Sequence, residues 1–375
     1  MIAGDWPYIM ADWHKDGKDK PVDQITPVML GEYFNFKNIP FDFAPSDESL
    51  PLVDQLAYRI GGKKDIFMIF NFNETLRRLY KEKSQYNDFR DLCRNNNLIV
   101  FQNDLTCQLT EALLAEPDFV DWINSMAPTV FLDGSPGISL KKGFDNCKFI
   151  ELWHPASSLP YTFPQLADMK DHKPDKDFLC LMCDRPMRPH RKLLHQRMAS
   201  AEFTGNAIYK FAKRSAHTHS DLDDQYQNRV IEGFSWRDGL PPLQYYNRTN
   251  FELVVETLTQ IDHDDTWFFS EKTTKPISMK HPFMILSNYN FLKNLQEMGF
   301  RTFHEHIDES YDRKTDVNDR IDIIIANLGV LARDSHRFYS DTHDIREHNH
   351  RHLQDLGGRF KTTLWKTLDE FWKNI

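Results

Sequence analysis

Apolar residues gather in short runs along the first half of this chain, and stretches of helical periodicity separate them. The runs lie at residues 65–70, 98–102, 129–132 and 149–153, and the helical stretches at 74–93 and 105–123. Short apolar runs without strict alternation are typical of strands buried on both faces, as in parallel sheets. The pattern therefore predicts a mostly parallel α/β sheet whose strands are joined by right-handed crossovers.

The second half repeats this rhythm from residue 178 onward. Strands are predicted at 178–183, 251–255, 283–286 and 301–303, and helices at 190–201, from 271 onward, and at 289–298, 320–331 and 335–372. Pro189 stands just before the first of these helices, where proline suits the first turn. Residues 155–176, between the halves, are rich in proline and charge, which is typical of an interdomain linker.

The composition limits the classes of protein and partner. A chain of 375 residues, 40% of them hydrophobic, can form two domains with cores of their own. The net charge of −9 argues against a surface that coats nucleic acid, so no nucleic-acid partner is expected. No apolar run approaches the roughly 20 residues of a membrane span, and the first residues lack the order of a signal peptide. Five scattered cysteines do not suit a secreted disulfide framework, so we expect a cytoplasmic protein.

The segment 265–286 carries the clearest chemical signal. An acid-base pair, Glu271-Lys272, stands between the aromatic run 267–269 and the apolar strand 283–286. A helix start that faces the end of a strand is where α/β proteins hold phosphates. The alternative is an ordinary surface helix with solvated charges.

The same segment resembles the donor-binding motif of GT-B glycosyltransferases, in particular the α-1,3-fucosyltransferase family and its viral and bacterial relatives. The matching residues are Ser270-Glu271-Lys272, then Lys275-Pro276, then 281–285. Two further segments agree with it. Residues 251–257 resemble that family's strand ending in a Glu-Thr pair, and residues 177–194 resemble its strand-turn-helix with arginine near the helix start. The resemblance covers roughly residues 175–325 and does not extend to the first half.

This resemblance implies an α/β fold of GT-B type, with two Rossmann-like domains facing a central cleft. Residues 1–160 would form the acceptor-side domain and residues 175–340 the nucleotide-sugar-binding domain. Residues 341–375 would form a C-terminal helix that packs back toward the first domain. The implied activity is transfer of a sugar, GDP-linked by analogy, from a nucleotide-diphosphate donor to a glycan or other hydroxyl acceptor. In such enzymes fixed cations usually replace a metal, so no cofactor is expected.

The donor site is predicted from residues that suit a diphosphate and a sugar. A leaving diphosphate gains negative charge in the transition state, so cations and helix N-terminal amides aimed at it lower the barrier. The candidate cations are Lys272 and Arg191, with Arg185 and Arg188 as neighbours. The resemblance assigns Glu271, beside Ser270, to a ribose or sugar hydroxyl, and Glu256 is the second carboxylate near the site.

The catalytic base for an inverting transfer is expected from the first domain. Asp104, Asp133 and His154 lie just beyond predicted strand ends, where the active sites of α/β proteins cluster. An aspartate in a Gly-Pro turn, as at Asp133, is also a common turn former.

Two other classes of function stay open. Histidines at 217, 219, 304, 306, 348, 350 and 352, with the acidic positions 308, 309, 312 and 316, would suit a metal-dependent hydrolase or nuclease. Most of these histidines are spaced i, i+2, which on a helix points the rings apart, so solvated or capping roles are favoured. Cys180 and Cys183 are interpreted as buried strand cysteines. The other class is a sugar-nucleotide-binding protein without catalysis.

Overall fold

The computed structural model describes ten segments of the chain and six single residues. They are residues 8–11, 42–45, 69–71, 99–103, 129–133, 147–151, 172–184, 188–213, 243–256 and 271–372, with positions 33, 36, 37, 121, 124 and 259. The chain forms two compact units. The first comprises Met1–Pro155 with Gly358–Ile375, and the second Ala156–Gly357.

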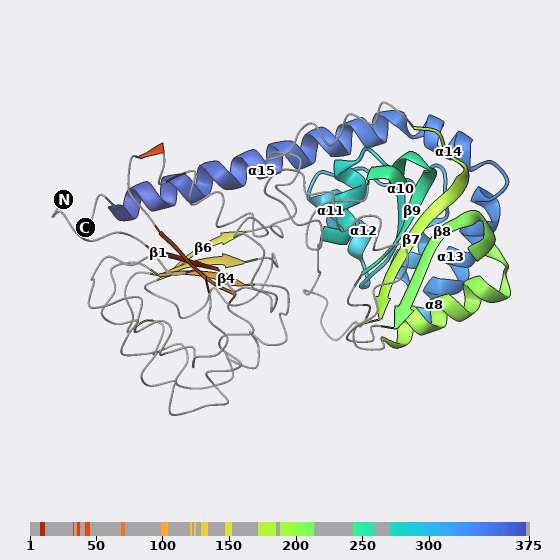
Figure 1. Cartoon of the computed structure of the whole chain (residues 1–375), viewed down its shortest axis with the longest axis horizontal. Helices are drawn as coiled ribbons and strands as arrows, with labels where there is room; N and C mark the ends of the chain where they lie inside the picture. The colour runs from red at the N-terminus through yellow and green to blue at the C-terminus, as the bar shows by residue number, and fades with distance from the viewer. Residues whose placement is uncertain are drawn as a thin grey trace. The chain divides into compact units, whose positions relative to one another are not determined.

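The first unit contains a four-stranded parallel sheet (Figure 1). Its strands are β3 (Ile69–Asn71), β4 (Ile99–Asn103), β5 (Thr129–Asp133) and β6 (Cys147–Glu151), adjacent in that order. A separate parallel pair, β1 (Tyr8–Ala11) and β2 (Asp42–Pro45), was not predicted. Within the helices predicted at 74–93 and 105–123, the structure describes only Asp121, and this residue is helical.

The second unit contains another four-stranded parallel sheet, in the order β10-β9-β7-β8. Its strands are β7 (Lys176–Asp184), β8 (Ala207–Lys213), β9 (Thr249–Val255) and β10 (Phe283–Leu286). The chain leaves β7 toward β8 on one side and leaves β9 toward β10 on the other. The carboxyl ends of β7 and β9 therefore meet at a topological switch point, the place where open α/β sheets bind ligands.

Helices of the second unit follow its strands (Figure 1). They are α8 (Pro189–Ser200), α10 (Leu243–Asn247), α11 (Glu271–Ser278), α12 (Phe291–Glu297), α13 (Val317–Leu331) and α14 (Ser335–Asp341), with 3-10 turns η5 (Phe203–Asn206) and η6 (Glu309–Arg313). Helix α13 packs against α8 and β10, α14 against β7 and β9, and α11 against β9. The predicted parallel sheet is confirmed in both units, and the predicted α/β class is confirmed in the second unit, whose helices are described.

The core of the second unit explains why the sequences of its central strands are short apolar runs. Every residue of β9 and of β10 is buried. On β7 and β9, Phe178 and Phe251 stack with ring centroids 5.3 Å apart, and Phe338 of α14 meets Phe251 edge-on at 5.8 Å. Burial of this kind contributes about 25 cal/mol per Å² of apolar surface.

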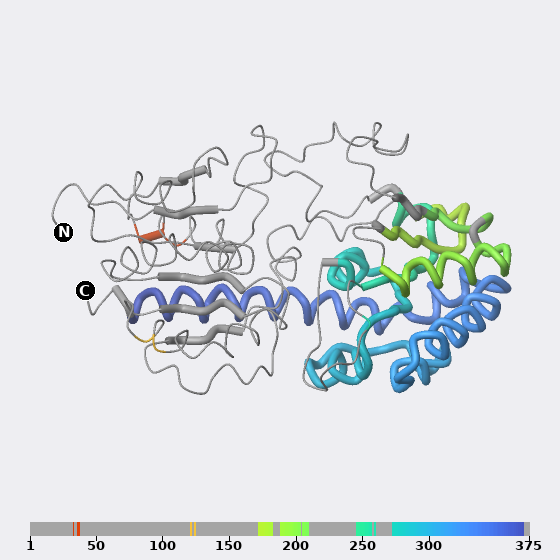
Figure 2. Tube along the Cα trace, turned by 90° about the horizontal axis from the view of Figure 1, so that it is seen from below, coloured from red at the N-terminus to blue at the C-terminus, as the bar shows by residue number. Residues whose placement is uncertain are grey.

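The last helix, α15 (His343–Trp372), runs for 30 residues without interruption (Figures 1 and 2). Its final turns belong to the first unit. There Asp369 accepts hydrogen bonds from the Tyr33 hydroxyl at 2.8 Å and the Lys37 ammonium at 3.0 Å. No helix in the described segments has both the length and the apolar character needed to cross a membrane.

The prediction of a strand at 301–303 is wrong. Side chains, rather than a neighbouring strand, form hydrogen bonds with the backbone of this segment. The amide of Arg301 donates to Oδ1 of Asn349 at 2.7 Å, and its carbonyl accepts from Nδ2 of Asn349 at 2.8 Å. The amide of Phe303 donates to Oε1 of Glu309 at 2.6 Å. The backbone polar groups are thus satisfied without a sheet.

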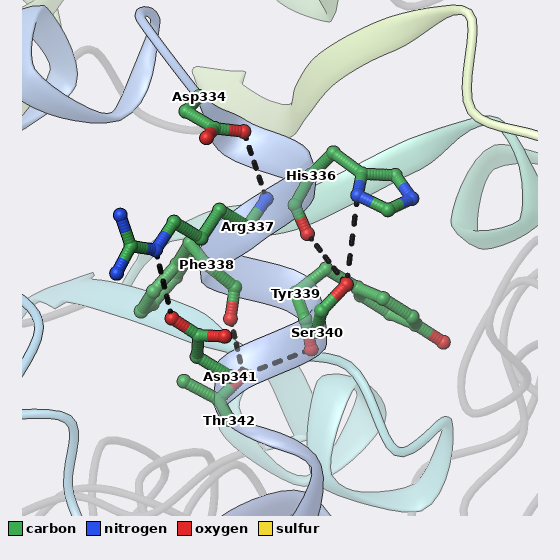
Figure 3. Close-up of polar contacts among 8 residues, drawn as sticks. All are labelled: Asp334, His336, Arg337, Phe338, Tyr339, Ser340, Asp341 and Thr342. Atoms are coloured by element: carbon green, nitrogen blue, oxygen red, sulfur yellow. Dashed lines mark hydrogen bonds and ion pairs between the residues drawn. The ribbon is translucent and has the colours of Figure 1, made fainter.

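The single helix predicted at 335–372 is in fact two helices, α14 and α15, which break at Thr342. The Thr342 hydroxyl donates to the carbonyl oxygens of Phe338 at 2.7 Å and Tyr339 at 3.3 Å (Figure 3). At the other end of α14, the amide of Arg337 donates to the capping side chain of Asp334 at 3.0 Å (Figure 3). Side chains therefore satisfy backbone groups at both ends of this short helix.

Candidate functional site

Glu256 joins four elements at the carboxyl edge of the second sheet. It directly follows β9 and is fully buried. Its amide donates to the carbonyl of Leu286, the last residue of β10, at 2.9 Å. From α8, His190 Nε2 and Arg191 Nη2 donate to its carbonyl at 3.2 and 3.3 Å. From α11, the Thr273 hydroxyl donates to its carboxylate at 2.8 Å.

The start of α8 supplies a buried arginine and, at the residue before the helix, a half-buried one. Pro189 occupies the first helical turn, as predicted, after Arg188 in an extended conformation. Arg191 is only 3% exposed, and its guanidinium also reaches the carbonyl of Val255 at 3.5 Å. Arg188 is half-buried. Of these two arginines, Arg188 is therefore the better placed to meet a ligand, while Arg191 ties α8 to the end of β9.

The start of α11 supplies the second cation. Lys272 is half-buried, whereas Thr273 and Thr274 are fully buried. Because Thr273 binds the carboxylate of Glu256, the position of Lys272 is determined by the end of β9. The backbone of α11 begins at Glu271, but the side chain of Glu271 lies outside the described residues, as does Ser270.

The imidazole of His190 is neutral at this edge of the sheet. Burial, together with the charges of Arg191 and Arg188, lowers the pKa of His190 to about 4, although the hydrogen bond to the Glu256 carbonyl acts in the opposite direction. A neutral imidazole can donate one hydrogen bond without bringing a charge into the interior. His190 therefore acts with Arg191 to hold the carbonyl of Glu256.

Arg320, which the sequence analysis did not identify, organises the adjacent part of the edge. It lies in the first turn of α13 and is 1% exposed. Its Nη1 donates to the carbonyls of Ser287 at 2.5 Å and Thr259 at 3.3 Å, and its Nε donates to the carbonyl of Lys314. The hydroxyl of Ser287 and Nη2 of Arg320 are buried without a hydrogen-bond partner among the described residues. A ligand oxygen or a water would satisfy both groups.

A signal for Arg320 was present in the sequence. Arg320, Ile324, Asn327 and Leu328 are spaced i, i+4, i+7 and i+8, and all four are buried on α13. A charged residue on an otherwise buried helical stripe needs hydrogen-bonding partners in the fold. The pattern identifies such a residue, but two of the carbonyls that it binds, those of Ser287 and Thr259, lie far away in the sequence.

Several residues of the acidic and histidine clusters considered for a metal bind backbone groups. The carboxylate of Asp312 accepts the amides of Leu292 at 2.8 Å and Lys293 at 3.2 Å, at the start of α12. His348 and His352 donate to the carbonyls that follow α12, those of Gly299 at 2.9 Å and Met298 at 2.7 Å. Within the described segments, no group of three or more His, Cys, Asp or Glu side chains is arranged to hold a metal ion.

The remaining candidates fall largely outside the described residues. Asp133 is the last residue of β5, but its side chain lies outside the described residues. Asp104, His154 and Arg185 lie outside the described residues. Cys180 is buried in β7, where burial raises the pKa of its thiol. A buried, protonated thiol fits the structural role expected for it.

The fold and the site define a parallel α/β protein with cations gathered at a switch point. In comparisons with known proteins, no family model matches this chain and no curated protein matches it.

Proposed function

We propose that this chain is a glycosyltransferase of GT-B type that uses a nucleotide-diphosphate sugar. The second unit would bind the donor at the carboxyl edge of its sheet, without a catalytic metal. The acceptor would be a glycan or another hydroxyl compound, and the donor would be GDP-linked by analogy with the fucosyltransferase-like motif.

One observation carries this proposal. The starts of α8 and α11 both attach to Glu256, through Arg191 on one side and Thr273 on the other. Arg188 lies three residues before Arg191, and Lys272 lies next to Thr273. Two half-buried cations and two helix N-termini are thus held at the same end of β9, the arrangement that suits a diphosphate.

The chemistry follows from the bond that breaks. When the bond between the anomeric carbon and the diphosphate opens, negative charge grows on the phosphate oxygens. Arg188 and Lys272, fixed by the fold, would stabilise that charge, because preorganised charges cost no reorganisation during the reaction. Arg185, Ser270 and Glu271 would complete the donor site.

Within this proposal Glu256 has a supporting role. It is fully buried, and its carboxylate is already bound to Thr273. It would set the position of α11 rather than contact the sugar. The base that deprotonates the acceptor hydroxyl would come from the first unit, where Asp104, Asp133 and His154 are the candidates.

A thermal-shift panel tests the donor site. GDP, UDP, ADP, CMP and dTDP would each be added at about 100 times Kd, with and without EDTA. Binding at that concentration stabilises the native state by about 2.7 kcal/mol. For a domain of this size the midpoint should then rise by several degrees, at about 2–4 °C per kcal/mol. We expect one nucleoside diphosphate to raise it equally with and without EDTA.

Two variants make the panel specific. Lys272→Ala should abolish most of the shift, since a charge-assisted contact to phosphate contributes about 2 kcal/mol. Lys293→Ala, an exposed lysine of α12 that faces Glu297 at 3.7 Å, is the matched control and should keep the shift. A shift that requires metal would favour a hydrolase, and no shift with any of the five would refute the donor site. Binding without turnover would favour a non-catalytic protein.

A further inference from the structure

Two histidines bind the same residue at the amino edge of the second sheet. That residue is Thr249, the first of β9, and it is fully buried. Nε2 of His172 donates to its carbonyl at 2.9 Å, and Nε2 of His281 lies 3.3 Å from its hydroxyl oxygen. His172 precedes β7 and His281 precedes β10, so the segments that lead into two strands meet here. Glu256 lies at the opposite end of β9.

The hydrogen bonds determine which nitrogen of each ring carries the proton. A carbonyl can only accept, so Nε2 of His172 is protonated. The hydroxyl of Thr249 donates to the carbonyl of Tyr245 at 2.8 Å, so it accepts from Nε2 of His281. Each imidazole thus makes its contact in the neutral form. His281 is only 1% exposed, so a second proton on it would place a charge in the interior.

A cation lies behind the ring on which His172 stacks. His172 stacks on Tyr339 of α14 with ring centroids 4.0 Å apart, and the guanidinium of Arg346 lies 3.8 Å from the same Tyr339 centroid. Two groups so close to one centroid must lie on opposite faces of the ring. Arg346 is held there by the carbonyls of Lys280 at 2.7 Å and Tyr339 at 2.9 Å. A protonated His172 would therefore face a fixed cation across one aromatic ring.

The other titratable neighbours come from α10 and α14. Tyr246 of α10 meets His281 edge-on, with ring centroids 5.1 Å apart, and donates its hydroxyl to the buried carboxylate of Glu252 at 2.7 Å. His336 of α14 would bring a further positive charge toward His172 in acid. The rings of His172 and His281 are 6.5 Å apart, so protonation of one disfavours protonation of the other.

Carboxylates of the surrounding elements are bound to other groups. Among the described residues, none is hydrogen-bonded to either histidine. Asp175 pairs with Arg248 at 2.6 Å, Glu347 pairs with Lys280 at 2.9 Å, and Asp177 accepts from the hydroxyl of Ser335 at 2.6 Å. The surroundings therefore favour the neutral form of both imidazoles.

His172 begins a short segment that is held against the junction of α10 and β9. The amide of Lys173 donates to the carbonyl of Asn247 at 2.9 Å. The amides of Asp175 and Lys176 donate to the carbonyl of Arg248 at 3.1 and 3.0 Å. The side chain of His172 thus adds a contact to Thr249 beside a row of backbone hydrogen bonds.

We propose that His172 and His281 form an acid-sensitive clip, which holds segment 172–176 on β9 while both rings are neutral and releases it when they are protonated. The clip lies at the amino edge of the sheet and does not rest on the donor site proposed above. It makes the entry of the chain into β7 respond to pH.

The direction of the effect follows from the surroundings of the two rings. Burial lowers the pKa of His172, as does Arg346, against the hydrogen bond to Thr249. Burial, His172 and Arg346 hold the pKa of His281 well below its usual value, against the backbone of Phe251. The released segment therefore binds more protons than the held one. The clip is at full strength above pH of about 6.5 and weakens as pH falls, by at most about tenfold per pH unit for each histidine.

Hydrogen exchange of the full chain between pH 7.5 and pH 5 tests the clip. The readout is the protection of the amides of Lys173, Asp175 and Lys176, corrected for intrinsic exchange rates. It should be lower than that of Ile324 and Leu328, which are buried in α13, and should fall by about tenfold from pH 6.5 to pH 5. Equal protection at all five amides would mean that the segment opens only when the whole unit unfolds, and would overturn the proposal.

Glutamine variants separate protonation from packing. His172→Gln and His281→Gln, combined in one protein, keep donors for Thr249 and cannot be protonated in this range. Protection of the three segment amides should then stay constant with pH. His304→Gln replaces an exposed histidine of the same unit and should keep the wild-type profile. A double variant with the wild-type profile would also overturn the proposal.

The wild-type protein gives a second readout that needs no substitution. The ring signals of His172 and His281, followed by NMR, should titrate below the ordinary value of about 6.5, over the range in which segment protection falls. An ordinary midpoint for both rings would refute the clip even if the double variant failed to fold. Neither readout depends on a bound nucleotide, so the clip and the donor site can fail separately.

Discussion

Arg191 and Lys272 were both predicted to hold the diphosphate, and their surroundings separate their roles. Arg191 is buried and donates to the carbonyls of Val255 and Glu256, whereas Lys272 is half-buried at the start of α11. The same kind of charge is buried and serves the fold in one position, and is only half-buried in the other. Spacing along the chain could not separate the two, because burial depends on the packing of α8 against the sheet.

Replacement of Arg191 should therefore damage stability first. Arg191→Ala is expected to lower the free energy of unfolding by about 2–4 kcal/mol, since hydrogen bonds to a charged group contribute about 1.5–3 kcal/mol each. Urea unfolding would measure this, with the exposed neighbour Lys192→Ala as control. Wild-type stability combined with lost nucleotide binding would instead assign Arg191 to the phosphates.

Buried histidines should make the protein sensitive to acid. Burial lowers the pKa of His190 to about 4 and lowers those of His172, His281 and His350 as well. Below pH 6.5 the unfolded chain binds more protons at these sites than the folded protein. Each group can then reduce stability by at most about 1.4 kcal/mol per pH unit down to its folded pKa.

We expect the free energy of unfolding to fall between pH 6.5 and pH 5, measured by urea unfolding at several pH values. His190→Gln keeps a donor for the Glu256 carbonyl and should make this fall less steep. Glu252 acts in the opposite direction between pH 4.5 and 7, because its pKa is raised. An unfolding free energy that rises toward pH 5 would show that the histidines are not the dominant groups.

At the scale of elements, strands buried on both faces were the most predictable. The strand predicted at 283–286 is confirmed as β10, and the strand predicted at 178–183 lies within β7. The strand β8 was missed, because its sequence AIYKFAK mixes polar and apolar residues. It is an edge strand in the sheet order, and edge strands do not need a continuous apolar run.

The segment 301–303, in contrast to β8, was predicted as a strand but does not form one. Its apolar residues suggested a strand, yet Asn349 from the distant helix α15 and Glu309, six residues after Phe303, satisfy its backbone. Asn349→Ala should lower the free energy of unfolding by about 2 kcal/mol, since it removes two hydrogen bonds of about 1 kcal/mol each. Arg351→Ala, an exposed residue of the same helix, should change it by less than about 0.5 kcal/mol. Equal effects of the two substitutions would contradict this role.

At the scale of the whole molecule, the chain forms two compact units, and α15 contributes residues to both. Its last turns contact Tyr33 through Asp369 and Trp365, the latter with ring centroids 5.8 Å apart. A chain that ends at Gly357 should therefore lose stability in the first unit and keep the second unit folded.

Calorimetry would check this expectation. Truncation after Gly357 should abolish or lower one unfolding transition and leave a second transition unchanged, still responsive to the nucleotide that binds the full chain. Tyr33→Phe, which removes only the hydroxyl bonded to Asp369, should lower the first transition slightly. Loss of both transitions on truncation would mean that the second unit cannot fold without the last turns of α15.

The sequence by itself determined the parallel α/β class, most strands of both sheets and the helix start beside Lys272, because strand burial and helix starts leave local patterns. Only the tertiary structure decided the strand order, the switch point and the role of Glu256. It also showed that Arg320 holds the carbonyls of Ser287 and Thr259. These contacts join residues far apart in the chain, and local patterns carry no information about which distant backbone groups a side chain will meet.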